Sequence, residues 1–168
     1  MFLVAERLFA DGKVTAGGVA VEVRDGKIAW SGARTAARLA GAEVIELGDR
    51  TILPGLIDAH LHFLGISTDH YDSLLFESHV YRALRAAGEA ERILRAGITS
   101  ARCLGSPVSP TLARAIREGH LVGPRIIASG QSLCATGGTW DIVEADRRVV
   151  QADPVAYVAS LYGAAERG

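Results

Sequence analysis

The chain has 168 residues, and its 18 lysine and arginine residues nearly balance 19 aspartate and glutamate residues, so the formal net charge is −1. This balance gives no electrostatic case for a nucleic-acid or membrane partner. No apolar run approaches the roughly 20 residues that span a bilayer, and the N-terminus lacks the features of a signal peptide. The two cysteines, Cys103 and Cys134, suit reduced thiols better than a disulfide framework. We therefore expect a cytoplasmic protein.

Residues 1–50 are predicted to form short β-strands joined by turns. Residues 17–24 alternate in polarity, Asp25-Gly26 supplies a hairpin turn, and residues 27–32 run back. Residues 43–48 form another short strand. Such a meander is too small to bury a core by itself, so it needs a partner surface.

From residue 51 onward, strand and helix signals alternate, which is typical of a parallel α/β architecture. The predicted strands cover 51–62, 98–103 and 124–129, and the predicted helices cover 77–96, 109–119 and 153–168. We therefore divide the chain into domains at 1–50 and 51–168. Three parallel strands leave an unpaired edge and an apolar face open to water, and the chain ends where a fourth strand would begin. We expect it to be one part of a larger folded object.

The most informative stretch is Pro-Gly-Leu-Ile-Asp-Ala-His-Leu-His at residues 54–62. Side chains alternate along a strand, so His60 and His62 are expected to point the same way. Neutral imidazole is a good ligand for zinc, nickel, copper or iron, so the pair is suited to hold a divalent cation at a strand end. A bare His-x-His also fits two surface histidines at a strand edge.

This whole motif resembles the first metal-binding strand of the amidohydrolase superfamily. Members of this superfamily are metal-dependent hydrolases built on a (β/α)8 barrel. The resemblance implies that His60 and His62 bind the metal and that Asp58 supports a ligand histidine by a hydrogen bond. An ordinary buried, hydrogen-bonded aspartate is the alternative for Asp58. The implied fold is α/β: half of a small β-sandwich over 1–50, then the first three βα units of a (β/α)8 TIM-type barrel over 51–168, incomplete alone.

A glycine-rich segment over 129–141 follows the third predicted strand and is expected on the same rim as the histidines. Residues 123–141 resemble the Gly-Pro-Arg…Ser-Gly…Thr-Gly-Gly-His-Gly-Asp stretch of a branch that includes Xaa-Pro dipeptidases, related carboxypeptidases and imidazolonepropionases. This resemblance predicts a substrate-binding loop, with a flexible surface loop as the alternative. Its members are Thr136, Gly137, Gly138, Thr139, Trp140 and Asp141.

The sequence departs from this branch at two positions of this loop and at one position of the second predicted strand. Thr139 replaces the usual histidine, Trp140 adds a large flat apolar surface, and Cys103 stands where an aspartate is common. We predict that Cys103 lines the substrate site, and that the substrate is less charged or more aromatic than a simple dipeptide. His70, His79 and His120 fit solvated or structural roles, and His79 is the one of the three predicted to contact substrate, because βα loops line the pocket of a barrel.

The resemblance implies a metal-dependent amidohydrolase that cleaves the amide-type C–N bond of a dipeptide-like or cyclic amide substrate through metal-activated water. We expect one or two divalent ions, zinc in the first instance. The family's other ligands come from later strands, so this portion holds no catalytic acid or base and needs a complementary C-terminal polypeptide; an oligomer is expected. The alternatives are another reaction on the same fold (deamination, hydration or dehydration, isomerisation) or a non-catalytic metal-binding or interaction subunit.

Overall fold

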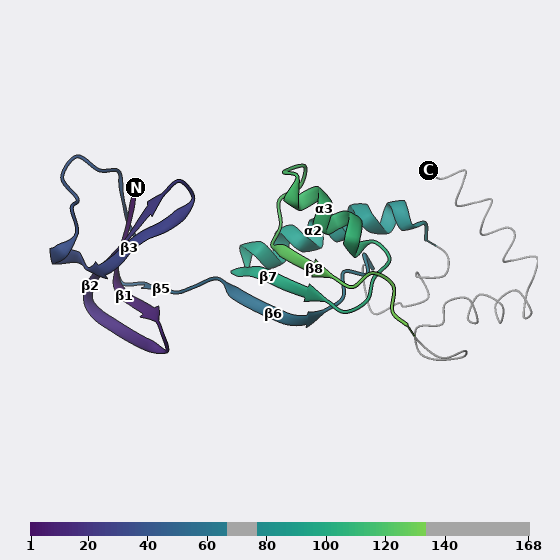
Figure 1. The fold of residues 1–168 in the computed structure, drawn as a ribbon, viewed down its shortest axis with the longest axis horizontal. Coiled ribbons are helices and arrows are strands. Elements are labelled where there is room, and N and C mark those ends of the chain that lie inside the picture. Colours follow the sequence, from purple (N-terminus) through teal and green to yellow (C-terminus); the bar gives the residue numbers. More distant parts are fainter. Residues whose placement is uncertain (67–76, 134–168) are drawn as a thin grey trace, which may run out of the picture. The chain divides into compact units, whose positions relative to one another are not determined.

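The computed structural model describes residues 1–66 and 77–133. The chain divides into two units, Met1–Pro54 and Gly55–Gly168 (Figure 1). The predicted helix over 153–168, the predicted loop residues 136–141 and His70 lie outside the described residues.

The described part of the first unit is a sheet with the strand order β3-β2-β1-β4, and β5 also pairs with β1. β1 is antiparallel to β2 and parallel to β4 and β5. Asp25 and Gly26 both have positive φ angles, 50° and 70°, which is typical of a two-residue hairpin turn of type I′. The predicted hairpin at this turn is confirmed. The strands are β1 Phe2–Ala10, β2 Lys13–Arg24, β3 Lys27–Ala33, β4 Val44–Glu46 and β5 Thr51–Ile52.

The core of this unit is small. Phe2, Val4 and Ala20 form its buried cluster, with partly buried side chains such as Trp30 packed around them. Ala5, Val19 and Val21 are also buried. Ile28, by contrast, leaves 73% of its surface exposed. A sheet with so little buried apolar area gains little stability from its own packing.

The described part of the second unit contains three parallel strands in the order β6-β7-β8, joined by two helices. These elements are β6 Leu56–Leu61, α2 His79–Arg95, β7 Ile98–Cys103, α3 Ser109–Arg117 and β8 Arg125–Ala128. The predicted strand over 98–103 is confirmed at both ends. The predicted strand over 124–129 and the two predicted helices are confirmed with slightly shorter bounds.

The single strand predicted over 51–62 is wrong. Thr51 and Ile52 pair with Arg7 and Leu8 of β1 in the first unit, whereas β6 begins only at Leu56. Pro54 lies between them and has no N–H to donate to a sheet, and Pro-Gly is a strong interruption of regular structure. The apolar run over 51–62 therefore contributes one strand to each of two sheets.

Both helices cover the same face of the second sheet. Their shared core comprises Phe63, Ala86, Ala90, Ala101, Cys103, Val108 and Leu112. Ala86 and Ala90 of α2 are fully buried, and such short side chains let the helix approach the strands closely.

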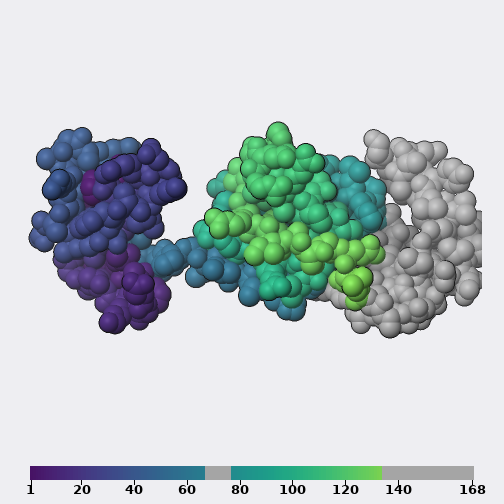
Figure 2. Space-filling view, viewed as in Figure 1, coloured from purple at the N-terminus to yellow at the C-terminus, as the bar shows by residue number. Residues whose placement is uncertain are grey.

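The other face of this sheet is uncovered within the described residues. Arg102 is exposed between two buried neighbours on β7 and is in register with Ile127, which is 65% exposed. Ile57 on β6 is in register with Ser100 and is 75% exposed. β8 also forms an edge of the sheet, and its residues are visible at the surface in Figure 2.

α2 is the longest helix of residues 1–66 and 77–133, at 17 residues. None of the helices in these ranges has the length and apolar character needed to cross a membrane.

The backbone after β6 lies directly against α2. Gly65 has a φ of +64°, and a Cβ there would collide with the carbonyl oxygen of Arg82. Arg82 Nε donates to the Leu64 carbonyl at 2.9 Å, and Arg85 Nε donates to the Gly65 carbonyl at 2.7 Å. Arg82 is fully buried, and burial lowers its pKa. This glycine therefore lets the end of β6 dock on the helix.

We expect Gly65→Ala to destabilise the folded protein by two effects, the backbone strain of a positive φ and a steric clash with Arg82. It should therefore cost more than a replacement of a glycine that causes backbone strain alone. Gly119→Ala is the matched control, because Gly119 has a φ of +80° but a Cβ added there would have no atom within 4 Å. The control should cost about 1–2 kcal/mol, and Gly65→Ala roughly 1–3 kcal/mol more through overpacking. Denaturant unfolding of the protein purified from its host measures both values, and equal losses would contradict the docking role.

Candidate metal site at the strand ends

His60 and His62 lie together at the carboxyl end of β6. Their ring centroids are 5.4 Å apart, with an angle of 70° between the ring planes. His60 is exposed and His62 is half-buried. The pairing of β6 with β7 is irregular between Asp58 and Leu61, yet the two imidazoles remain neighbours, as the alternation of the sequence predicts.

A backbone carbonyl fixes the ring of His62. Its Nδ1 lies 2.8 Å from the carbonyl oxygen of Gly105. A carbonyl only accepts hydrogen bonds, so Nδ1 is the protonated nitrogen, and in the neutral ring Nε2 carries the lone pair. Metal-binding histidines are commonly held by such a bond on the nitrogen that does not bind the metal.

Gly105 is the point where three strand ends converge. A Cβ on this buried residue would collide with Ser132 Oγ and would lie 3.5 Å from His62 Nδ1. Ser132 follows β8, so residues from the ends of β6, β7 and β8 meet here. Neither Gly105 nor Ser132 is among the predicted site residues; the position of Gly105 just beyond a predicted strand was the available signal.

Main-chain hydrogen bonds connect the same three strand ends. The Leu104 N–H donates to the Leu61 carbonyl at 3.0 Å, and the Ser129 N–H donates to the Cys103 carbonyl at 3.1 Å. Each bond extends the pairing of neighbouring strands into the segments that follow them. Backbone hydrogen bonds therefore help to hold the rim that carries the histidines.

Asp58 contacts the main chain of the site. Its Oδ1 accepts a hydrogen bond from the backbone N–H of His60 at 3.0 Å. The described contact thus supports the main chain of a candidate ligand histidine, and the predicted role of Asp58 as a support of the metal site stays a prediction.

The structure contradicts the predicted position of Cys103 in the substrate site. Cys103 is fully buried in the core between the sheet and the two helices, and its sulfur accepts a weak hydrogen bond from the Phe63 N–H at 3.5 Å. The Cys103 side chain lies on the face of the sheet that the helices cover, where it packs in the core. The adjacent Arg102 lies on the opposite, exposed face.

His79 is the first residue of α2 and is exposed. It therefore begins the helix that follows β6 in the chain, and its predicted contact with substrate stays a prediction. The predicted loop residues Thr136, Gly137, Gly138, Thr139, Trp140 and Asp141 lie in the part of the chain that the structure does not describe.

The histidine pair fits part of a metal site. Catalytic zinc typically takes three protein ligands, and among residues 1–66 and 77–133 no group of three or more His, Cys, Asp or Glu side chains is placed to hold an ion. Two neighbouring imidazoles, one of them oriented by a carbonyl, match the donor chemistry of zinc. A zinc ion held by this pair would need a further ligand from outside the described residues.

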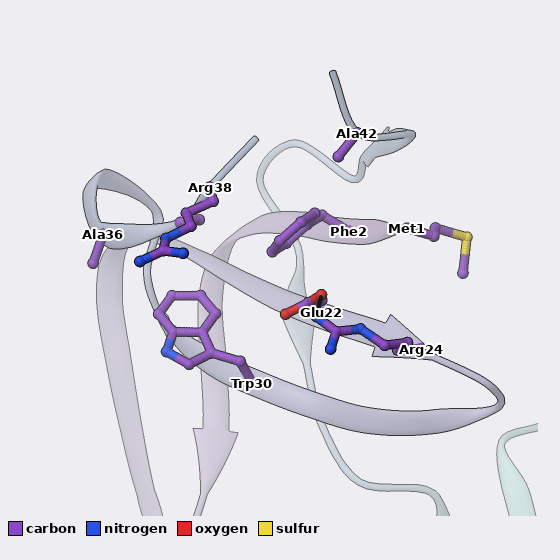
Figure 3. A pocket seen from close by; sticks show the side chains of 9 residues that line it. Met1, Phe2, Glu22, Arg24, Trp30, Ala36, Arg38 and Ala42 are labelled. Carbon is purple, nitrogen blue, oxygen red and sulfur yellow. Dashed lines mark hydrogen bonds and ion pairs between the residues drawn. The ribbon is translucent and has the colours of Figure 1, made fainter. Parts of the chain in front are cut away.

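The first unit contains a separate cavity of about 560 Å³ (Figure 3). Its lining includes Phe2, Trp30 and Arg38. The one lining carboxylate, Glu22, is paired with Arg24 at 2.5 Å. This lining includes no histidine or cysteine among the described residues, so the strand-end histidines remain the stronger candidate site.

The ionisation of Glu89 on α2 is expected to make the stability of the fold depend on pH. Burial raises the pKa of Glu89, against the opposing effects of the Gly65 N–H and of Arg92 and Arg85. The folded state therefore holds this proton more tightly than the unfolded chain does, and the associated stability is present at low pH and lost as the pH rises through the folded pKa. Glu89→Gln should reduce the fall in the free energy of unfolding between acidic and neutral pH.

Denaturant unfolding at a series of pH values tests this expectation. Glu91→Gln, two residues along the same helix, is the matched control. An identical pH slope for Glu89→Gln and the wild-type protein would refute the burial effect.

The sequence is similar to a model of the amidohydrolase family over residues 51–165. It is 36% identical over 94 residues to an ochratoxinase of Aspergillus niger, covering 54% of this chain and 19% of that protein. It is 37% identical over 109 residues to an imidazolonepropionase of Solibacter usitatus, covering 62% of this chain and 25% of that protein. The chain thus spans a quarter or less of the length of these two relatives.

Solved structures agree with the sequence matches. An Xaa-Pro dipeptidase with methionine bound in its active site superposes with a TM-score of 0.74 and 27% identity, over 83% of this chain and 35% of that chain. The ochratoxinase of A. niger superposes with a TM-score of 0.72 and 28% identity, over 89% of this chain and 36% of that chain. The predicted resemblance is confirmed: with a family match over residues 51–165 and these folds as neighbours, the chain belongs to the amidohydrolase family.

Proposed function

We propose that this chain is the N-terminal part of a metal-dependent amidohydrolase that hydrolyses an amide-type C–N bond. The observation that carries the proposal is the histidine pair at the end of β6, with ring centroids 5.4 Å apart and His62 oriented by the Gly105 carbonyl. Enzymes on parallel α/β barrels place their active sites at the carboxyl ends of the strands, where this pair lies.

In this proposal, His60 and His62 supply two of the metal ligands. A divalent metal, zinc in the first instance, would polarise the scissile carbonyl and lower the pKa of a coordinated water. Gly105 keeps the ring of His62 in one tautomer, and Asp58 holds the backbone N–H of His60. This portion supplies metal ligands and their supports, and the catalytic acid or base belongs to the remaining part of the enzyme.

We propose a dipeptide-like or cyclic amide as the substrate. An Xaa-Pro dipeptidase is among the structural neighbours, and its name describes an enzyme that acts on a dipeptide. Ser132 adds a hydroxyl at the rim next to Gly105, which is a suitable hydrogen-bonding group for a substrate amide. The loop over 136–141 and His79 complete the proposed substrate contacts.

The proposed partner is a polypeptide segment that carries the remaining barrel strands, either on a separate chain or as a continuation of this one. The uncovered sheet face supports this proposal, because Ile57 and Ile127 expose 75% and 65% of their surfaces. Apolar residues on both sides of a parallel sheet are usually covered. The small β-sandwich would be completed by the same missing part.

Intact mass and elemental analysis of the protein purified from its native host test the proposal directly. We expect the chain together with the missing strands, and one or two zinc-like ions per assembly. A lone, metal-free chain of this length would overturn the proposed activity.

Replacing either histidine should remove the metal. His60→Asn and His62→Asn are expected to weaken metal binding by more than the roughly 10–100-fold typical of losing a supporting hydrogen bond. His120→Asn is the matched control, because His120 is exposed and precedes β8 at the opposite end of that strand from the rim. Metal content after dialysis measures the effect, and full retention in both site variants would exclude these ligands.

Residues 1–168 produced alone should aggregate or form a molten species, because the uncovered face exposes Ile57, Ile127 and Leu56, the last at 52%. Size-exclusion chromatography with light scattering and a thermal melt followed by circular dichroism test this expectation. A monodisperse monomer with a cooperative transition would contradict it.

A further inference from the structure

We propose that Ser106 is a positioning residue that sets the tautomer and orientation of His62. The inference rests on the proposed metal site and extends it to a residue in the turn between β7 and α3. Ser106 touches neither ring of the histidine pair in the described contacts. It acts through Gly105, whose carbonyl oxygen holds His62 Nδ1 at 2.8 Å.

The polar groups of Ser106 are all engaged in hydrogen bonds, although the residue is 1% exposed. Its hydroxyl donates to the Phe63 carbonyl at 2.5 Å and accepts from the Val108 N–H at 3.2 Å. Its N–H donates to the Gly130 carbonyl at 2.8 Å, and its carbonyl accepts from the Ser109 hydroxyl at 3.0 Å. One side chain and its peptide groups therefore join the segments after β6, β7 and β8.

The bonds of Ser106 and Gly105 form a two-point clamp. Phe63 follows His62 in the chain, and Ser106 follows Gly105. The Ser106 hydroxyl binds the Phe63 carbonyl while the Gly105 carbonyl binds the His62 ring. Two adjacent residues of one segment thus hold two adjacent residues of the other, which fixes the distance and the angle at which the Gly105 carbonyl meets the imidazole.

Removing the hydroxyl breaks the first of these points. The Phe63 carbonyl and the Val108 N–H then lose a buried partner, which favours movement of the turn. A shifted Gly105 carbonyl binds the Nδ1–H less well, so the share of His62 that is protonated on Nδ1 falls and the share protonated on Nε2 rises. In the tautomer protonated on Nε2, the nitrogen assigned to the metal carries a proton and has no lone pair to offer.

Histidine 15N NMR of the protein purified from its host and stripped of metal reads the tautomer of His62. The wild-type ring should be protonated on Nδ1, and Ser106→Ala should give a mixture. Ser106→Cys keeps nearly the same volume and leaves only a weak donor, so it tests the same bond where the alanine variant fails to fold. Ser109→Ala is the matched control, since Ser109 is equally buried and its hydroxyl contacts only the Ser106 carbonyl among the described residues.

A zinc competition titration on the same variants supplies the second readout. Affinity should fall about 10-fold in Ser106→Ala and Ser106→Cys and change little in Ser109→Ala. A wild-type ring protonated on Nε2, or wild-type tautomer and affinity in both Ser106 variants, would overturn the inference. If the tautomers change as expected while no form of the protein binds zinc, the clamp stands and the proposed metal function fails.

Discussion

The structure of the second unit depends on how its three parallel strands are covered. The helices α2 and α3 pack on one face, where Ala101 and Cys103 are buried. The opposite face carries Arg102 and exposed isoleucines on the neighbouring strands. Parallel sheets are typically buried on both faces, whereas this sheet has one covered face and one face that is open within the described residues. The candidate site lies at the carboxyl ends of these strands, between the covered and the open face of the sheet.

Backbone geometry, more than side-chain bulk, shapes the rim of that site. Gly65 brings the segment after β6 against α2, because any Cβ there would collide with the Arg82 carbonyl. Gly105 plays the corresponding part after β7, where a Cβ would collide with Ser132 Oγ. Both glycines lie within a few residues of a strand end. The absence of a side chain at these points lets three separate segments reach one location.

Pattern-based prediction worked where the physical signal is local. The Asp25-Gly26 turn was recognised because only a few residue pairs adopt two consecutive positive φ angles. α2 and β7 were placed correctly because helical spacing, a glycine stop and a short β-branched run follow directly from the chain. The strand over 51–62 was misread, since its apolar character is continuous while its hydrogen-bond partners belong to two different sheets.

Side-chain roles at the site were harder to predict than the elements that carry them. His60 and His62 emerged from alternation along one strand, and the ring separation of 5.4 Å agrees with it. Cys103 was assigned to the pocket from a resemblance, yet the face that it takes depends on where the helices pack. Asp58 accepts a hydrogen bond from the main-chain N–H of His60, and local spacing does not tell a main-chain contact from a contact with the ring.

The sequence by itself determined the family, the order of the elements and the histidine pair, because these follow from short-range periodicity and from one compact motif. Tertiary structure alone decided which face Cys103 occupies, which nitrogen of His62 is protonated, and how Gly105, Ser106 and Ser132 meet at the rim. Those outcomes depend on contacts between residues far apart in the chain, such as His62 with Gly105. Hydrophobic periodicity carries no information about such pairs, because it records how each segment meets a core and not which segments meet one another.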